Sequence, residues 1–169
     1  RWPWHCTQLQ AGPLRARMEQ FCREQGFVAE ILLWPLFEGQ VLTAGIMGII
    51  PRLRYLLVTP ALLHALNWDE LRSVLAHEIG HVTGRHVAHM IEQSKKLNIA
   101  TLGAMIAGML LGGGGKGSQA AVATAMAGAQ ALALKYTREN ETDADQNGLQ
   151  YVLKGGYDPQ GLVTFLNKI

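Results

Sequence analysis

The sequence predicts an α+β fold that is mostly helical, with a small N-terminal sheet packed on one central helix. Three short apolar runs between residues 27 and 59 are separated by proline or glycine, which is typical of strands. After residue 60, apolar residues recur at helical spacing. The central helix carries the pattern His-Glu-x-x-His at residues 77–81. We expect residues 1–169 to form a single domain, or a fragment of a longer protein.

The composition is that of a folded protein and gives no sign of nucleic-acid binding. Hydrophobic residues make up 49% of the chain, charged residues 17%, and the net charge is only +2. The basic residues are scattered rather than gathered in a tract, so no nucleic-acid partner is expected. Cys6 and Cys22 do not form a CxxC motif. They could form one disulfide in an oxidising compartment or remain two separate thiols.

The N-terminal third predicts one helix and then three strands. Residues 12–25 place four apolar side chains on one helical face, and Gly26 is expected to end this helix. The strands are predicted in the runs FVAEILLW, QVLTAGIMGII and RYLLVT. Gly45 and Gly48 in the middle run indicate that another backbone comes close to the strand. A short helix is expected to start at Pro60.

Asn67 marks the start of the helix that carries the histidine pattern. Its side chain can cap the helix, and Glu70, three residues on, completes a capping box. Apolar residues then follow at helical spacing, at Leu71, Val74, Leu75, Ile79 and Val82. The histidine pattern is therefore predicted to lie inside a helix and not in a loop.

The pattern itself predicts a metal site with a catalytic base. His77 and His81 are four residues apart, so on a helix both imidazoles lie on one face and can bind one ion. Two imidazoles suit Zn²⁺, although the spacing alone does not exclude other transition metals. Glu78 lies about 100° around the helix from His77, so its carboxylate can activate zinc-bound water without being a ligand. This arrangement is typical of peptidases, and the alternative is an ordinary helix rich in histidine.

A catalytic zinc ion usually has three protein ligands, so one ligand must come from elsewhere. On an unbroken helix, His86 and His89 would point about 180° and 120° away from His77. Both are therefore expected to lie outside the ligand set. The remaining candidates are the carboxylates of the acidic segment that follows residue 138.

Residues 138–154 are expected to form a helix that begins with its acidic residues and ends before the sequence GGYDP. Glu139 and Asp143 continue into polar residues and are expected to face solvent. Glu141 and Asp145 share a face that should pack inward, because it continues into Gly148, Leu149 and Val152. Glu141 is therefore the predicted third ligand.

Other residues of the same helix are predicted to support the site. Asp145 is expected to accept the second ring N–H of His77 and so fix its tautomer. The small residues Ala144 and Gly148 would let this helix lie close to the zinc helix. Tyr136 and Arg138 are candidates for stabilising the transition state, because they lie near Glu141 in the sequence.

Residues 97–134 contain one lysine and no acidic residue. Each apolar arm is about 15 residues long, shorter than the ~20 residues that a helix needs to span a bilayer. The glycine-rich run 112–117 separates the two arms. We predict a buried helical hairpin with a mobile glycine tip. The alternative is a hairpin that contacts a membrane and brings the protein to lipid-bound substrates.

HEIGH, the apolar insertion and RENETDAD together resemble the HtpX-like and CAAX-prenyl-protease-like gluzincin zinc metallopeptidases, over about residues 53–160. The flank LAHEIGHVTGRH and the glycine-rich insertion are most similar to the periplasmic BepA-type branch. The RxxExxAD pattern of the family falls on Arg138, Glu141, Ala144 and Asp145. The resemblance implies a zincin-like catalytic domain with one Zn²⁺ per chain. It also implies that an edge strand just before the zinc helix aligns an extended polypeptide substrate.

We therefore expect a zinc-dependent metalloendopeptidase that cleaves peptide bonds with Glu78-activated, zinc-bound water. The resemblance implies a role in quality control of misfolded or membrane-associated proteins, and a periplasmic or membrane-associated location. A chaperone-like or scaffold protein, with a structural zinc ion or a plugged site, is the alternative. A closed zinc site with four protein ligands would favour that alternative.

Overall fold

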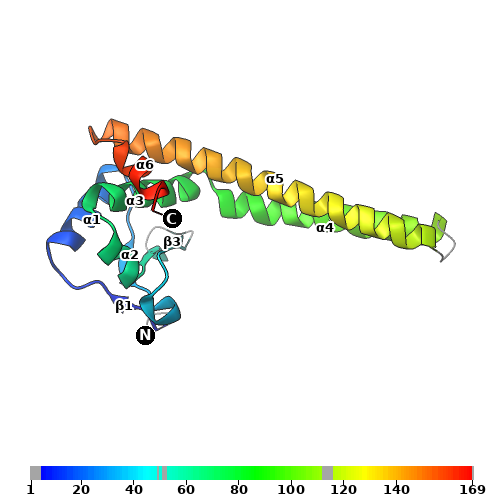
Figure 1. Cartoon of the computed structure of the whole chain (residues 1–169), viewed down its shortest axis with the longest axis horizontal. Helices are drawn as coiled ribbons and strands as arrows, with labels where there is room; N and C mark the ends of the chain where they lie inside the picture. The colour runs from blue at the N-terminus through cyan, green and yellow to red at the C-terminus, as the bar shows by residue number, and fades with distance from the viewer. Residues whose placement is uncertain (1–4, 49, 51–52, 112–115, 169) are drawn as a thin grey trace. The chain divides into compact units, whose positions relative to one another are not determined.

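The computed structural model describes residues 5–48, 50, 53–111 and 116–168 (Figure 1). The chain forms two compact units, one of Arg1–Thr83 with Asp143–Ile169 and the other of Gly84–Thr142. The first unit holds a four-stranded sheet and the second is helical. The predicted α+β fold, mostly helical with a small N-terminal sheet, is therefore confirmed.

The sheet has the strand order β1-β2-β4-β3. Strand β2 (Glu30–Leu33) is parallel to β4 (Tyr55–Val58), and the outer strands β1 (Thr7–Gln8) and β3 (Ala44–Met47) are antiparallel to their neighbours. The sequence did not predict β1, because two residues are too short for a periodic pattern. The strand that precedes the histidine-bearing helix, β4, lies inside the sheet. The expectation that this strand forms the edge is wrong, since β3 occupies the edge.

The two glycines of the middle run behave differently. Gly48 follows β3 with φ +98°, and a methyl group added there would lie 2.0 Å from the carbonyl oxygen of Leu53. The predicted close approach is therefore confirmed at this position. At Gly45 it is wrong, because an added methyl group would meet no atom within 4 Å.

One face of the sheet and three helices form the main core of the first unit. The helices are α1 (Pro13–Glu24), α2 (Pro60–Ala65) and α3 (Trp68–Thr83), in agreement with the predicted helices. Residues from the sheet, from these helices and from the end of α5 share the core, among them Phe21, Ile31, Leu56, Leu71, Leu75, Ile79 and Val152. The helix that carries the histidine pattern is therefore held rigidly against the sheet.

Cys6 and Cys22 are buried thiols that do not form a disulfide. Cys22 belongs to the main core, whereas Cys6 packs with Leu32 and Leu57 in a second, smaller cluster. Adjacent strand residues point to opposite faces, so the two thiols lie on different sides of the sheet. Burial raises the pKa of Cys22 to about 12, which keeps this thiol protonated and unreactive.

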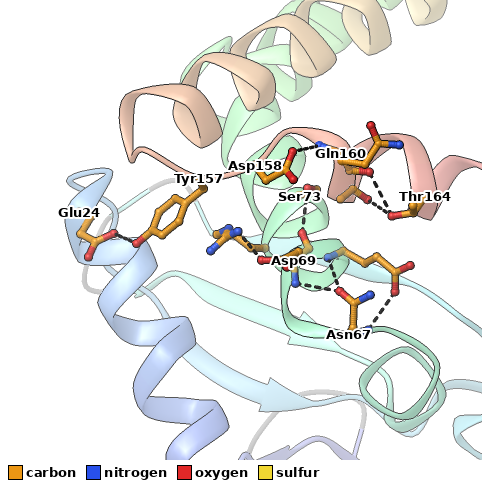
Figure 2. Close-up of polar contacts among 11 residues, drawn as sticks. Glu24, Asn67, Asp69, Ser73, Tyr157, Asp158, Gln160 and Thr164 are labelled. Carbon is orange, nitrogen blue, oxygen red and sulfur yellow. Dashed lines mark hydrogen bonds and ion pairs between the residues drawn. The ribbon is translucent and has the colours of Figure 1, made fainter.

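The capping box at the start of α3 is confirmed (Figure 2). The side-chain oxygen of Asn67 accepts hydrogen bonds from the backbone N–H groups of Asp69 and Glu70, both at 3.0 Å. The Glu70 carboxylate in turn accepts the backbone N–H of Asn67 at 2.9 Å. Glu70 is only 2% exposed, and the ammonium of Lys168 donates to it at 2.7 Å. These bonds define where α3 begins.

The C-terminal segment is tied to α1 and α3. Helix α6 (Gln160–Leu166) follows the turn that ends α5. The Tyr157 hydroxyl donates to the Glu24 carboxylate at 2.7 Å, as Figure 2 shows. The guanidinium of the buried Arg72 lies 3.7 Å from the centre of the Tyr157 ring, which is a cation–π contact.

The second unit is a pair of helices with two departures from prediction. Helix α5 (Lys116–Lys154) is continuous, so the expectation of a helix starting near residue 138 is wrong. The alanine-rich segment before residue 138 contains no proline, so nothing interrupts the helix there. Helix α4 (His86–Leu111) begins after a break at Arg85, whose φ is +54°. The angles predicted for His86 and His89 relative to His77 assumed that one unbroken helix contains all three residues. Because the helix is broken at Arg85, these angles are wrong.

The prediction of a buried hairpin is also wrong. None of the described side chains between residues 97 and 134 is fully buried. Most of the expected glycine-rich tip, residues 112–115, lies outside the described residues. Within the described part of the chain, no helix is both long and apolar enough to cross a bilayer.

Glu70→Gln should remove a pH-dependent part of the stability. The hydrogen bond from Lys168, followed by that from the Asn67 backbone, lowers the pKa of Glu70 below its usual 4.5. Its contribution is therefore present above about pH 4.5 and is lost as the pH falls through the lower folded pKa. We expect Glu70→Gln to reduce the free energy of unfolding by about 1–3 kcal/mol at neutral pH, as for a hydrogen bond to a charged group. Urea unfolding between about pH 3 and pH 7 measures the difference.

Glu92→Gln is the matched control, because Glu92 also pairs with a lysine but on the surface. This variant should unfold like the wild type throughout the pH range. A stability difference for Glu70→Gln that did not shrink below about pH 4.5 would contradict the assigned role of the carboxylate.

Candidate metal centre

The histidine pattern lies in the last two turns of α3, and its two imidazoles converge. The Nε2 atoms of His77 and His81 are 3.0 Å apart, and both side chains are half-buried. Two nitrogens bound tetrahedrally to one zinc ion at about 2.0–2.1 Å would be roughly 3.3–3.4 Å apart. The observed separation is close to this value, so the same two atoms can bind one ion with a small adjustment of the rings.

Asp145 of α5 orients the first of these rings. The Asp145 carboxylate lies 2.8 Å from Nδ1 of His77. When Nδ1 carries the proton and donates it to the carboxylate, Nε2 becomes the acceptor and hence the metal-binding atom. The interaction therefore selects the tautomer in which Nε2 points toward His81.

Glu141 brings an oxygen to the same place. One ligand atom each of His77, His81 and Glu141 can be chosen such that all lie within 4.8 Å of one another. Glu141 lies four residues before Asp145 on the continuous helix α5, so the contact of Asp145 with His77 also fixes the region that Glu141 can reach. Two imidazole nitrogens and one carboxylate oxygen are a donor set that suits Zn²⁺. The residues therefore fit the implied metal.

The two helices can approach this closely because small residues line the crossing. A methyl group added at Gly80 would lie 2.7 Å from the Ala144 carbonyl oxygen. One added at Gly148 would lie 3.0 Å from the backbone nitrogen of His77. The expectation that Ala144 and Gly148 allow a close approach is confirmed, and Gly80 is a third contributor that the sequence analysis missed.

The inward face of α5 differs from prediction at two residues. Ala144, Gly148 and Val152 are buried and lie four residues apart. Glu141 and Leu149, which were expected on this face, are both exposed. The buried stripe therefore follows the i, i+4 row of small residues, because only these permit backbone contact with α3.

A second contact between the helices was missed by sequence reasoning. The Tyr151 hydroxyl donates to the Thr83 hydroxyl at 2.9 Å, and Thr83 donates to the backbone oxygen of Ile79 at 3.0 Å. Tyr151 is 68 residues after Thr83, the same separation as between His77 and Asp145. The two helices therefore run in the same direction in a constant register. Neither residue type stands out by itself, so this repeated separation is the signal that could have found the pair.

The remaining candidates occupy other places. Glu139 pairs with Lys135 at 3.7 Å, and Asp143 accepts a hydrogen bond from Asn147 at 2.9 Å, both at exposed positions. On the same helix, Tyr136 is half-buried and Arg138 is exposed. His86 is buried and His89 is exposed. Among the described residues, none of these joins the histidines in a group that could bind a metal.

A small sheet against a His-Glu-x-x-His helix, with a carboxylate from a later helix beside the histidines, defines the zincin-like class of metallopeptidases. A family model agrees with this class. The chain belongs to peptidase family M48, whose model matches residues 9–169.

The chain is also similar to longer proteins. It is 36% identical over 104 residues to the beta-barrel assembly-enhancing protease of Escherichia coli strain K12, and 38% identical over 104 residues to that of Yersinia pestis. Each match covers 61% of this chain and 21% of the relative. The chain therefore spans about a fifth of the length of these curated relatives.

A solved structure supports the fold. The crystal structure of S. mikatae Ste24p matches with a TM-score of 0.72 over 96% of this chain and 43% of that chain. The sequence identity is 18%, so this similarity concerns the fold alone.

Gly80→Ala should weaken metal binding because its methyl group would push α5 away from α3. We expect at least a roughly 10-fold loss of zinc affinity, and a loss of about 1–3 kcal/mol in unfolding free energy from overpacking. Gly148→Ala should act in the same direction with a smaller effect. Zinc titration against a competing chelator and urea unfolding measure the two quantities.

Gly128→Ala is the matched control on the same helix α5, because an added methyl group there meets no atom within 4 Å. It should leave zinc affinity unchanged and raise stability by up to about 1 kcal/mol through helix propensity. Wild-type zinc affinity in Gly80→Ala would show that the close crossing does not set the ligand geometry.

Asp145→Asn should weaken zinc binding by about 10- to 100-fold, because the amide cannot accept the His77 proton with the strength of a carboxylate. Asp143→Asn, two residues earlier and hydrogen-bonded to Asn147, should bind zinc as the wild type does. Competitive zinc titration compares the two variants. Equal affinities would remove Asp145 from the proposed site.

Proposed function

We propose that the chain is the catalytic domain of a zinc-dependent metalloendopeptidase. The observation that carries the proposal is the convergence of ligand atoms from His77, His81 and Glu141 within 4.8 Å. These three residues would hold the ion, with Asp145 orienting His77. A zinc ion in such a site supplies a Lewis acid that polarises a carbonyl group and acidifies water.

Glu78 is proposed as the general base and general acid. It follows His77 directly on α3, so its carboxylate points to a neighbouring sector of the helix and not along the ligand face. The carboxylate would take a proton from the attacking water and then deliver it to the nitrogen of the leaving amine. The peptide C–N bond breaks in this second step, and the carboxylate is restored.

The edge strand β3 is proposed to bind the substrate in an extended conformation. β3 pairs with β4 through one edge, and in the described sheet its other edge has no neighbouring strand. The same strand packs against α3, which carries the histidines. A polypeptide that adds to this edge as a further strand would therefore run beside the zinc helix.

Tyr136 and Arg138 are proposed to stabilise charge in the transition state. Both precede Glu141 on α5 by at most five residues, and a phenol or a guanidinium can donate hydrogen bonds to a developing oxyanion. Loss of turnover with unchanged zinc affinity in Tyr136→Phe or Arg138→Gln would support this role. Loss of zinc from either variant would contradict it.

The names of the relatives support a role in the cell envelope. They are called beta-barrel assembly-enhancing proteases. We therefore propose that this domain acts on misfolded or membrane-associated envelope proteins, in a periplasmic or membrane-associated location.

Glu78→Gln should abolish hydrolysis while zinc is retained. Glutamine cannot accept the proton of water, so we expect the rate of peptide cleavage to fall by at least about 10²-fold. Casein or peptide cleavage, with zinc content measured on the same sample, tests this. Full activity in Glu78→Gln would contradict the proposed role of Glu78. If the wild type binds zinc but hydrolyses no substrate, a structural zinc ion in a chaperone-like protein is favoured instead.

Glu141→Gln and Glu139→Gln distinguish the ligand from its neighbour two residues away. Glu141→Gln should lose zinc affinity together with activity, whereas Glu139→Gln should keep both, because Glu139 pairs with Lys135 at an exposed position. A reversal of this pattern would move the ligand to the other face of α5.

A further inference from the structure

The hairpin of α4 and α5 in the second unit exposes its large apolar residues. On α4, an outward stripe of Ile99, Leu102, Ile106 and Leu110 repeats every three or four residues. On α5, Met126, Leu132 and Leu134 are also exposed. These seven side chains are 43–79% exposed, and such a concentration of exposed apolar surface indicates an interaction site.

The less exposed positions of the same hairpin are of mixed size. From residue 97 on, the half-buried positions of α4 are Leu97, Thr101, Met105 and Gly108, and those of α5 before residue 134 are Val122, Ala125 and Ala129. The large side chains of Ile99, Leu102, Ile106 and Leu110 are exposed. Bulky apolar residues that face outward are the reverse of a helix built for water and are typical of helices that contact lipid.

The charge of this region identifies the kind of surface that it fits. Residues 95–138 contain five basic residues and no acidic residue. The bases lie at the ends of the apolar arms, at Lys95, Lys96, Lys116, Lys135 and Arg138. Basic residues that flank apolar helices favour the headgroup layer of an anionic membrane, where their charges stay hydrated.

Two ion pairs flank the apolar arms of the hairpin, and in both the lysine lies closer to the apolar arm than the glutamate does. Lys96 pairs with Glu92 at 2.9 Å, and Lys135 pairs with Glu139 at 3.7 Å. In both pairs the lysine lies nearer to the apolar arm, because α4 runs toward the tip and α5 runs away from it. The acidic residues therefore lie beyond the ends of the apolar arms.

We propose that the described arms of the hairpin, residues 97–111 and 116–134, dock on an anionic lipid surface and lie in its interface. The arms are about 15 residues, or roughly 22 Å of helix, against the ~30 Å of a hydrocarbon core. Lys95 and Lys96 would reach headgroups when the hairpin lies along the surface with the stripe from Ile99 to Leu110 in the acyl boundary.

A second copy of the chain fits this surface less well than lipid does. Each hairpin carries the same five positive charges between residues 95 and 138, so two hairpins would repel one another.

The experiment measures binding of the 169-residue chain to vesicles of phosphatidylcholine, with and without phosphatidylglycerol, by flotation. We expect binding that requires phosphatidylglycerol and weakens with salt. Leu102→Gln with Ile106→Gln should lower the partition coefficient by roughly 30-fold or more. Lys95→Gln with Lys96→Gln should lower it by roughly 10-fold. The measurement needs no peptidase activity, so it is independent of the proposed function.

Val28→Gln with Val163→Gln is the matched control, because both valines are exposed apolar residues of the first unit. This variant should bind vesicles as the wild type does. The proposal is overturned if Leu102→Gln with Ile106→Gln binds vesicles normally, or if binding is equal without phosphatidylglycerol. It is also overturned if the chain self-associates through the hairpin and the dimer no longer binds vesicles.

Discussion

The candidate metal centre depends on one constraint, the close crossing of α3 and α5. Side chains at this crossing are almost absent: Gly80 faces the Ala144 carbonyl oxygen, and Gly148 faces the backbone of His77. Because the backbones nearly touch, short side chains on the two helices can meet, as Asp145 and His77 do at 2.8 Å. A single added methyl group would separate the helices and move the carboxylates away from both imidazoles.

The rest of the first unit holds α3 in place for this crossing. The capping box at Asn67 defines the start of the helix, and the ion pair of Glu70 with Lys168 links that start to the C-terminus of the chain. Leu71, Leu75 and Ile79 bury the opposite face of the helix in the core shared with the sheet. The histidines lie at the other end of this helix, so the core fixes the direction from which they approach α5.

Local sequence patterns predicted much of this arrangement. They failed where contacts between distant parts of the chain determine helix ends or buried faces. The cap at Asn67, the helices and the small sheet follow from spacing and turn residues, which act over a few neighbours. The expected helix start near residue 138 was wrong, because an acidic run favours a helix start but cannot break an alanine-rich helix. The angle predicted for His86 around the helix was wrong, because Arg85 has a positive φ and interrupts the helix between α3 and α4. Leu149 is exposed although its helical spacing predicted that it faces inward. Only small residues fit where α5 crosses α3.

The sequence by itself determined which residues could form a metal site, because two histidines four residues apart on a helix must share a face. It also limited the third ligand to the acidic segment around Glu141. The tertiary structure decided that these residues meet, since they are some 60 positions apart and only the packing of α5 on α3 brings them together. It also decided whether residues 97–134 are buried. Their composition predicted burial, but none of the described side chains there is fully buried, and large apolar ones such as Ile99 and Leu110 are exposed.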